Sequence, residues 1–313
     1  MKYCAPHARL DVTSHLARPS FDDSIVLGKD PAWPRISIVT PSFNQAGFLE
    51  KAVLSVLNQN YPNLEFIVVD GGSSDSSPQI LEKYRKYFSY WVSEKDDGQA
   101  DALRKGFSRA TGDILAWLNS DDFYLPGIFH HVADRFRGRQ TDVIYGEEYY
   151  CDQEDRILGI RPQLPFPARI GPALFVFGGF WINQPTAFWT RDLYDRVGGV
   201  NKDFRFAMDN DLLIRFALSG ARFTHTKRYV VGFRTHEHSK TSTIQDVGIE
   251  ETRLLAERYG NQIPRLLRNA FLTRNLGRCY QLRHLVYGNP RYIFVKYFYK
   301  LMAKVGFHCS FPD

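Results

Sequence analysis

The chain has 313 residues, of which 44% are hydrophobic and 15% aromatic, so it can bury a full core and is not a disordered or fibrous sequence. Its net charge of +6 is uneven, because residues 261–313 carry nine Lys or Arg against one acidic residue, which leaves residues 1–260 with a net charge of −2. This distribution does not favour nucleic-acid binding by the main body, and we expect no nucleic-acid partner.

The sequence carries no membrane or secretion signal that we recognise. No apolar run approaches the length of a membrane span, and the first ten residues are charged and contain His7 without an apolar stretch. Cys4, Cys151, Cys279 and Cys309 lie far apart without metal-ligand spacing, which is typical of free thiols in the cytoplasm. We therefore expect a cytoplasmic protein.

Strand and helix patterns alternate along the main body of the chain. Residues 1–34 are rich in proline, lack periodicity and are interpreted as an N-terminal extension. We then predict, in chain order, a strand at 36–40, a helix at 48–57, a strand at 64–69, a helix at 80–88, a strand at 90–93, a helix at 100–110, a strand at 114–118, a helix at 128–136, a strand at 143–146, helices at 193–197 and 211–218, and a strand at 229–234. This alternation predicts an α/β fold with a mainly parallel central sheet flanked by helices.

The same patterns suggest how the chain is divided. We predict a catalytic domain over residues 35–250, with halves at 35–125 and 126–250, followed by a basic helical extension over 251–313. Within the second half, residues 156–171 are rich in proline and are expected to be irregular. Residues 175–188, with several aromatic residues and glycines, are expected to form a loop-lined pocket.

Polar clusters follow three of the predicted strands, at residues 40–44, 70–75 and 119–122. The carboxyl ends of parallel strands meet at one edge of a sheet, where α/β proteins bind ligands, so these clusters should converge on one crevice. There Asp70 could accept hydrogen bonds from a base or a ribose hydroxyl, and Gly71 and Gly72 would let the backbone approach a ligand closely. Taken alone, the second cluster could equally be an ordinary turn with a helix cap.

Asp121 and Asp122 stand side by side at the end of the buried strand at 114–118. Adjacent carboxylates repel, so a site that keeps both ionised usually has a cation nearby. Hard oxygen ligands favour Mg²⁺ or Mn²⁺, most often with a phosphate in the same coordination shell. The alternative is a solvated helix cap, which is the better explanation for an isolated pair of aspartates.

Three segments together resemble glycosyltransferase family 2, a group of inverting enzymes with the GT-A fold. They are VTPSFNQAGFLEKAVLSVLNQNYPNLEFIVVDGGSSD, GQADALRKGFSRATGDILAWLNSDD and AMDNDLLIRFALSG, and the resemblance covers roughly residues 36–242. The run QPTAFW followed by VGG is similar to a subgroup that commonly builds bacterial surface polysaccharides. The resemblance implies a hexosyltransferase-type inverting enzyme with a nucleoside-diphosphate sugar donor, a UDP-sugar being favoured, and a glycan or lipid-linked glycan acceptor.

The resemblance also implies which residues bind the nucleotide sugar in the first half of the catalytic domain. Pro41 and Phe43 would border the base, with Phe43 stacking on it. Asp70 would bind the base or ribose, and Asp121 would lie near the ribose. The full implied set is Thr40, Pro41, Phe43, Asn44, Asp70, Ser73, Asp75, Gly98, Gln99, Asp101 and Asp121.

For the metal, Mn²⁺ or Mg²⁺, the resemblance implies Asp122 and His236 as ligands. His236 could instead be an ordinary hydrogen-bonded histidine of the fold. Asn119 stands where the family often has Asp, yet Asp121 and Asp122 are retained, so we expect metal binding to persist.

A second departure from the family lies in the helix predicted at 100–110. Leu103 and Arg104 replace an Arg and an Asn that many relatives turn toward the nucleotide. Arg104 or Lys105 could supply the charge for the phosphates instead, and a solvated helix face is the alternative.

The acidic run at 208–211 occupies the place of the family's catalytic motif, and the resemblance makes Asp209 the general base for the acceptor hydroxyl. An unperturbed Asp has a pKa of about 3.9, so it becomes a useful base only in a desolvated pocket that raises this pKa. The alternative is a helix N-cap. Trp181, Gln184 and Asp211 would bind the acceptor, although core packing explains Trp181 nearly as well.

The basic segment at 291–304 interleaves lysines and an arginine with aromatic and aliphatic residues at helical spacing. This pattern suits a helix lying on an anionic membrane surface, which would place the protein peripherally on the inner face of the cytoplasmic membrane. A helix packed against the catalytic domain is the alternative.

Two other functions fit parts of the pattern. A catalytically silent sugar-nucleotide-binding or scaffolding protein of the same fold would explain Asn119 and Leu103, but the retention of Asp122 and Asp209 argues against it. A nucleotidyltransferase would need a basic phosphate-binding signature after the first strand, and the segment TPSFNQ lacks it.

Overall fold

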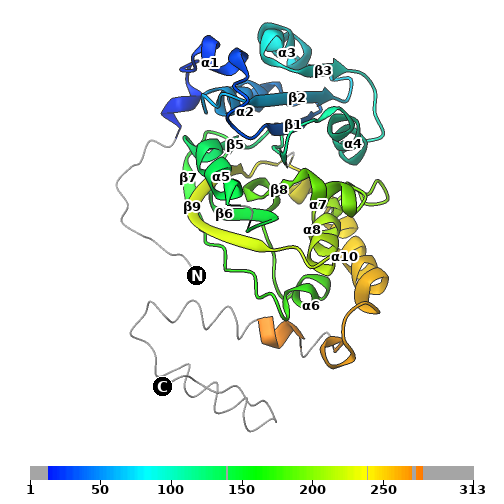
Figure 1. The fold of residues 1–313 in the computed structure, drawn as a ribbon. Helices are drawn as coiled ribbons and strands as arrows, with labels where there is room; N and C mark the ends of the chain where they lie inside the picture. The colour runs from blue at the N-terminus through cyan, green and yellow to red at the C-terminus, as the bar shows by residue number, and fades with distance from the viewer. Residues whose placement is uncertain (1–12, 139, 238, 270–272, 278–313) are drawn as a thin grey trace.

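The computed structural model describes residues 13–138, 140–237, 239–269 and 273–277 (Figure 1). These residues form one nine-stranded sheet with the order β3-β2-β1-β4-β8-β6-β9-β5, and β7 pairs with β6 outside this path. The first part of the chain lies at the top of Figure 1, and the second part, in green and yellow, lies below it.

The first half of the sheet is entirely parallel and alternates with helices, as the sequence pattern predicts. Its elements are β1 (Ile36–Ser42), α2 (Ala46–Leu57), β2 (Leu64–Asp70), α3 (Ser77–Tyr84), β3 (Tyr90–Ser93), α4 (Gln99–Arg109) and β4 (Ile114–Trp117). The register pairs Ser42 with Asp70, and Asp70 with Ser93. The carboxyl ends of β1, β2 and β3 therefore meet at one edge of the sheet.

The second half is mixed, because β8 and β5 run antiparallel to their neighbours while β6 and β9 pair in parallel. Its elements are β5 (Phe123–Tyr124), α5 (Ile128–Arg137), β6 (Val143–Cys151), β7 (Ile157–Arg161), α6 (Gly171–Val176), β8 (Phe188–Thr190), α7 (Arg191–Arg196), α8 (Met208–Leu218), β9 (Phe223–Arg234), α9 (Lys240–Thr243) and α10 (Gln245–Gly260). The predicted α/β fold with flanking helices is confirmed. The predicted division of residues 35–250 into two halves stays a prediction.

One sequence-based expectation for the second half is corrected. Residues 156–171 are not wholly irregular, because β7 forms a hairpin with β6 through a turn in which Asp155 has a φ of 65°. Residues 177–187, between α6 and β8, form a loop that contains one short helical turn at Gln184–Thr186, and the pocket expected there stays a prediction. The strand β7 has only five residues, too few for its periodicity to stand out among the prolines that follow it.

Apolar side chains cover both faces of the sheet and join its two halves. On one face α2 buries Leu49 and Val53 with the strand residue Phe66, and on the other α4 and α8 pack against the sheet. Trp117 of β4 meets Trp189 of β8 edge-on, with ring centroids 5.5 Å apart. Each large apolar side chain buried in this way contributes about 1.5–3 kcal/mol. The two core clusters, one on each face of the sheet, both contain residues of the first and the second half.

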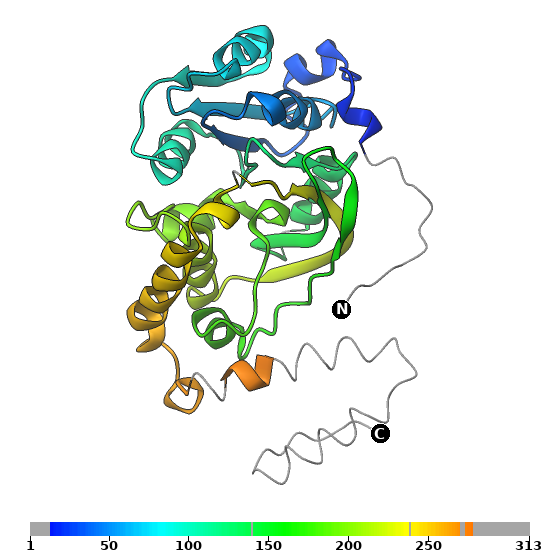
Figure 2. The same cartoon turned by 180° about the vertical axis from the view of Figure 1, so that it is seen from behind.

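The segments that flank the main body pack against it where the structure describes them. In the N-terminal extension, a short helix at Ser14–Leu16 and α1 (Asp23–Gly28) bury Leu16 and Val26 in the same core as α2. At the other end α10 runs beside α8 (Figure 2), and the hydroxyl of Tyr259 donates to Asp211. The predicted membrane segment at 291–304 lies outside the described residues.

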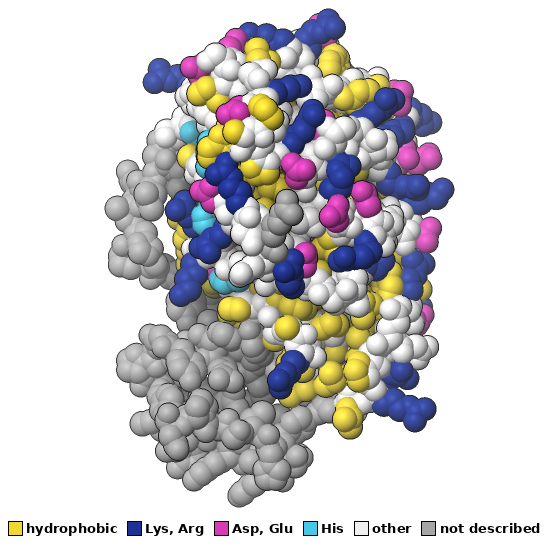
Figure 3. All heavy atoms as spheres, viewed as in Figure 1, with side chains coloured by type: hydrophobic (Ala, Val, Ile, Leu, Met, Phe, Trp, Pro, Cys, Tyr) yellow, Lys and Arg dark blue, Asp and Glu magenta, His cyan; other side chains and the backbone are white. Residues whose placement is uncertain are grey.

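The surface gives no sign of a single-sign charge stripe on the face drawn in Figure 3, where basic and acidic side chains are mixed over the upper part of the molecule. Within the described ranges, none of the helices combines the length and apolar character that crossing a membrane requires.

Candidate active site

Asp70 is fully buried at the end of β2 and organises the nucleotide edge of the sheet. Its Oδ1 accepts a hydrogen bond from the Ser73 hydroxyl at 2.6 Å, and its Oδ2 accepts from the Ser73 N–H at 2.8 Å and from the Ser93 hydroxyl at 2.7 Å. Ser93 comes from the neighbouring strand β3 and was missed by sequence reasoning. A carboxylate has about four acceptor positions, so Asp70 keeps capacity for a ligand.

Asn44 and Asp75 connect the loop after β1 to the loop after β2. The Asn44 N–H donates to the Ser73 hydroxyl at 2.7 Å, and the Asn44 Oδ1 accepts from the Ser74 N–H at 2.9 Å. Asp75 accepts from the N–H groups of Ala46 and Ser77, both at 2.9 Å, and so holds the starts of α2 and α3. These side chains fix the shape of the loops around the predicted nucleotide edge.

Several groups at this edge are free to meet a ligand. The buried hydroxyls of Thr40 and Ser42 have no hydrogen-bond partner among the residues that the structure describes. Pro41 lies beside them in β1, and the Phe43 side chain is 59% exposed. Other buried polar atoms without a partner, such as the Tyr124 hydroxyl, lie elsewhere in the described residues, so the exposed Phe43 ring is the stronger sign of a ligand contact here.

Asp96 is a further acidic residue at this edge that sequence reasoning missed. A Cβ added at Gly71 would lie 3.0 Å from its Oδ2, so a larger residue there would require the carboxylate to shift by a few tenths of an ångström. Burial raises the pKa of Asp96, while the Gly98 N–H at 2.8 Å opposes the shift. It follows β3 by three residues, so the strand-end rule that found Asp70 could have found it as well.

The two adjacent aspartates after β4 have different surroundings. Asp122 is buried; its Oδ1 accepts from the Arg234 N–H at 3.0 Å, and its Oδ2 accepts from the Asn119 amide at 3.3 Å. Burial, followed by the charge of Asp121, raises the pKa of Asp122 well above its usual range. The Asp121 side chain is 20% exposed, and its Oδ2 lies 3.1 Å from Nε2 of His236.

Arg234, at the end of β9, supports this pair of aspartates from behind. Its Nη1 donates to the Asp121 carbonyl at 2.7 Å, and its Nε donates to Asp155 at 2.5 Å. Asp155 also accepts from Lys51 of α2, so the β6–β7 turn, α2 and the aspartate loop are tied together. Arg234 is fully buried, and no local sequence signal separates it from an ordinary strand residue.

Asp121 and His236 are the pair best placed to share a divalent cation with a ligand. Among the described residues, no group of three or more His, Cys, Asp or Glu side chains could hold a metal ion. Mg²⁺ and Mn²⁺ are commonly held by one or two protein groups together with phosphate oxygens and water, so the pair fits such an ion. The assignment of the cation to Asp122 stays a prediction. Both oxygens of Asp122 already accept hydrogen bonds, one from the Arg234 N–H and one from the Asn119 amide.

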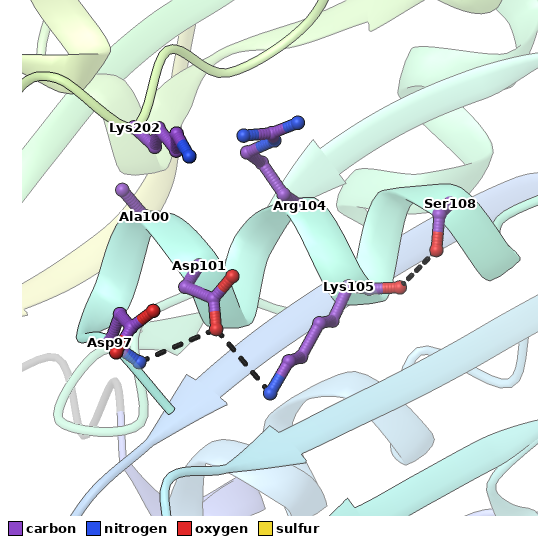
Figure 4. A pocket seen from close by; sticks show the side chains of 7 residues that line it. All are labelled: Asp97, Ala100, Asp101, Arg104, Lys105, Ser108 and Lys202. Atoms are coloured by element: carbon purple, nitrogen blue, oxygen red, sulfur yellow. Dashed lines mark hydrogen bonds and ion pairs between the residues drawn. The ribbon is translucent and has the colours of Figure 1, made fainter. Parts of the chain in front are cut away.

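The start of α4 faces the same loop. Gly98 has a φ of 101° and precedes Gln99, whose Nε2 donates to Asn119 at 2.7 Å and whose Oε1 accepts from Lys240 at 2.7 Å. Asp101, two residues further on, pairs with Lys105 at 3.3 Å (Figure 4). Asp101 also lines an open cavity of about 380 Å³. The residues around this cavity are Asp97, Ala100, Asp101, Arg104, Lys105, Ser108 and Lys202.

Asp209 stands at the start of α8, and burial raises its pKa while the Asn210 N–H, at 2.7 Å, and the charge of Lys240 oppose the shift. Burial also lowers the pKa of Lys240 to about 8, against the opposing charges of Asp209 and Glu251. A desolvated carboxylate that takes up a proton above its usual pH range has the property that a general base needs.

Glu251 of α10 fixes the backbone that leads into α8. Its carboxylate accepts from the N–H groups of Arg205 at 2.7 Å, Phe206 at 2.8 Å and Ala207 at 2.8 Å. These three amides directly precede Met208 and Asp209, so the position of Asp209 depends on a helix that begins at Gln245. Sequence reasoning missed Glu251 because nothing local links it to residues 205–207.

The predicted acceptor residues have unlike surroundings, and their acceptor role stays a prediction. Asp211 is fully buried and accepts from Arg215 at 2.5 Å and from the Tyr259 hydroxyl at 2.6 Å, which joins α8 to α10. Gln184 is buried and its amide donates to the Trp117 carbonyl at 2.9 Å. Trp181, by contrast, is 41% exposed and can contact a ligand.

Comparison with known proteins identifies the family. The pattern of the family described as Glycosyl transferase family 2 matches residues 37–197. The chain belongs to glycosyltransferase family 2. This family 2 chain is 33% identical over 190 residues to an uncharacterized glycosyltransferase of Mycobacterium tuberculosis, covering 59% of this chain and 70% of the relative. It is also 26% identical over 215 residues to an uncharacterized glycosyltransferase of Rickettsia typhi, covering 67% of each chain.

Solved structures of glycosyltransferases share the fold. S. aureus TarS in complex with UDP-GlcNAc superposes with a TM-score of 0.56 at 17% identity, covering 73% of this chain and 72% of that one. The mannosyltransferase PcManGT from Pyrobaculum calidifontis, in complex with GDP-Man and Mn²⁺, superposes with a TM-score of 0.55 at 15% identity, covering 94% of this chain and 85% of that one. The predicted GT-A fold is thus confirmed, and the family 2 chain is a glycosyltransferase.

Proposed function

We propose that the chain is a metal-dependent inverting glycosyltransferase that moves a sugar from a nucleoside-diphosphate sugar, with a UDP-sugar favoured, to a glycan or lipid-linked glycan acceptor in surface polysaccharide biosynthesis. The donor class is supported by relatives of the same fold that bind UDP-GlcNAc or GDP-Man. The pathway is supported by the QPTAFW and VGG runs.

The donor nucleotide would bind at the carboxyl ends of β1, β2 and β3. Phe43, whose side chain is exposed, would stack on the base. Asp70 and Asp96 would accept hydrogen bonds from the base or the ribose. Asn44, Ser73 and Asp75 would shape these loops rather than touch the base.

Asp121 and His236 would hold the cation together with the diphosphate of the donor. This choice is supported by the exposure of Asp121 and by the 3.1 Å between its Oδ2 and His236 Nε2. When bound there, a divalent cation would neutralise negative charge on the departing diphosphate. Asp122 would position Asp121 from behind, through Arg234 and Asn119.

Asp209 would take the proton from the acceptor hydroxyl as its oxygen attacks the anomeric carbon. The bond from that carbon to the diphosphate oxygen breaks on the opposite face, so one displacement inverts the anomeric centre. The observation that carries this proposal is the position of Lys240, whose ammonium contacts Gln99 at the aspartate loop and whose charge reaches Asp209. Lys240 therefore links the proposed base to the loop that carries the proposed cation ligand Asp121.

The experiment that tests the function is donor turnover with Mn²⁺ and a panel that includes UDP-GlcNAc and GDP-mannose. Asp209→Asn should lower turnover about 100-fold or more, as expected for loss of a general base, while donor binding is retained. Asp203→Asn is the matched control, because Asp203 is an exposed carboxylate six residues earlier and only pairs with Arg258. Full turnover by Asp209→Asn would contradict the role of the base, and donor binding by the wild type without turnover would favour a silent binding protein.

A further inference from the structure

An unbroken chain of side-chain hydrogen bonds crosses the candidate site. Lys240 Nζ donates to Gln99 Oε1 at 2.7 Å, Gln99 Nε2 donates to Asn119 Oδ1 at 2.7 Å, and Asn119 Nδ2 donates to Asp122 Oδ2 at 3.3 Å. Lys240 is the first residue of α9 and Gln99 the first of α4, while Asn119 and Asp122 follow β4. This series of hydrogen bonds thus joins three segments that are far apart in the sequence.

The ammonium of Lys240 fixes the direction of every bond in this series. An ammonium can only donate, so the two amides must each accept on the Lys240 side and donate on the Asp122 side. Gln99 must turn its oxygen to Lys240 and its nitrogen to Asn119. Asn119 must then accept with its oxygen and donate with its nitrogen. A carboxylate at position 119 could not make the last bond.

We propose that Asn119 is a positioning residue that must be an amide in this protein, because it orients Asp122 behind Asp121 and, through Gln99, holds Lys240 of α9. Its link to catalysis rests on the proposed function. The Asn at a place where the family often has Asp is therefore matched to Gln99 and Lys240, and is not a weakened form of the usual motif.

The surroundings of Asp122 explain why this support matters. Its Oδ1 is held by the Arg234 N–H, and its own N–H donates to the Asn119 carbonyl at 3.1 Å, so residues 119–122 form a closed turn. The remaining oxygen, Oδ2, depends on the Asn119 amide. Aspartate at 119 would place a second negative charge about 3.3 Å from this buried oxygen, and like charges at that distance disfavour the ionised pair.

The other end of the chain lies among charges. Lys240 is half-buried, and the charged groups that act on it are Asp209, Glu251 and Arg205. Gln99 is its hydrogen-bond partner from the nucleotide half. The hydrogen bond to Gln99 keeps the positive charge of Lys240 near Asp209, the proposed base, when no donor is bound.

A reciprocal exchange of the amide and the acid tests the proposal. The variants are Asn119→Asp, Asp122→Asn and the double variant that carries both. In the double variant the carboxylate introduced at position 119 accepts from Gln99 and from the amide introduced at position 122. The oxygen of that new amide accepts from the Arg234 N–H, so each bond regains a donor and an acceptor with the net charge unchanged.

The first measurement is the Tm of the full chain in EDTA without nucleotide, and the second is the affinity for UDP with Mn²⁺. Asn119→Asp should lower the Tm and weaken UDP binding about tenfold, as expected for a hydrogen bond replaced by a buried like-charge contact. The double variant should recover the Tm. Recovery of both the Tm and UDP binding would support the hydrogen-bond series with Asp121 as the cation ligand. Recovery of the Tm alone would support the same hydrogen-bond series with Asp122 as the cation ligand.

Two results would overturn the proposal: an Asn119→Asp variant with the Tm and UDP affinity of the wild type, or a double variant no more stable than Asn119→Asp. Should Asn119→Asp prove too unstable to purify, a folded double variant supports the proposal and an unfolded one contradicts it. A wild-type chain that binds neither UDP nor GDP would count against the proposed function, whereas the Tm series in EDTA would still decide the role of Asn119.

Discussion

The two halves of the molecule build their parts of the candidate site in different ways. In the first half, the functional groups stand at the ends of parallel strands, and short loops hold them through contacts such as Asp70 with Ser73 and Ser93. In the second half, the backbone before Asp209 is held by Glu251 from a distant helix, and Arg234 of β9 reaches the Asp121 carbonyl of the first half. The nucleotide edge is therefore a property of local strand ends, and the catalytic side is a property of the assembled domain.

The largest effect should come from the residue that joins the two halves. Replacing the buried Arg234 by Met removes the cation that pairs with Asp155 and the donor to the Asp121 carbonyl. Loss of one partner of a buried ion pair costs about 3–5 kcal/mol, so the free energy of unfolding, measured with urea, should fall by that amount.

Arg222→Met is the control for Arg234→Met, because Arg222 forms an exposed ion pair with Asp142. Exposed pairs contribute about 0–1 kcal/mol. Equal losses in the two variants would mean that the halves are not coupled through Arg234.

The next effect concerns the loop before α8. In Glu251→Gln only one oxygen remains to accept from the backbone N–H groups of residues 205–207. The new NH₂ group would face at least one of these N–H donors without an acceptor. We expect a loss of about 1–3 kcal/mol in the free energy of unfolding, and a fall in turnover larger than the fall in UDP affinity.

Glu257→Gln, on the same helix but exposed and paired with Arg253, should change neither quantity. If Glu251→Gln weakened UDP binding as much as turnover, the idea that α10 serves the catalytic side alone would be wrong.

A smaller effect should appear in the pH dependence of stability. Burial raises the folded-state pKa of Asp209 above its ordinary value of 3.8, so its contribution to stability is present below that value and is lost as pH rises through the folded-state pKa. Asp209→Asn does not titrate, and its stability relative to the wild type should increase from acidic to neutral pH. The measurement is urea unfolding across this pH range, with the exposed Asp203→Asn as the reference. A difference in the free energy of unfolding between Asp209→Asn and the wild type that did not change with pH would contradict the prediction.

The smallest effect on stability is expected at the nucleotide edge. Phe43 is 59% exposed, so Phe43→Ala should leave the Tm unchanged. An aromatic stacking contact contributes about 0.5–1.5 kcal/mol, so UDP affinity should fall roughly two- to tenfold. Ile249→Ala, at a 72% exposed position on α10, should leave UDP affinity unaltered, and a similar loss in both variants would argue against stacking.

Sequence alone was sufficient for the α/β alternation and for the convergence of residues 40–44, 70–75 and 119–122. Both follow from short-range rules, because strand periodicity and the polar residues that end a parallel strand lie close together in the chain. The hairpin formed by β7 and the helix α6 did not follow, since these elements have only five and six residues and show little periodicity. Asp96 could have been found by the same strand-end rule.

The amino-acid sequence by itself determined the family, the order of the elements and the edge of the sheet where polar groups gather. Only the tertiary structure decided that Asp121 is the more open of the two aspartates, that Glu251 and Arg234 hold the catalytic side, and that Asn119 stands in a chain from Asp122 to Lys240. The physical reason is that burial and hydrogen-bond direction depend on neighbours in space, and these neighbours are up to about 140 residues apart in the sequence.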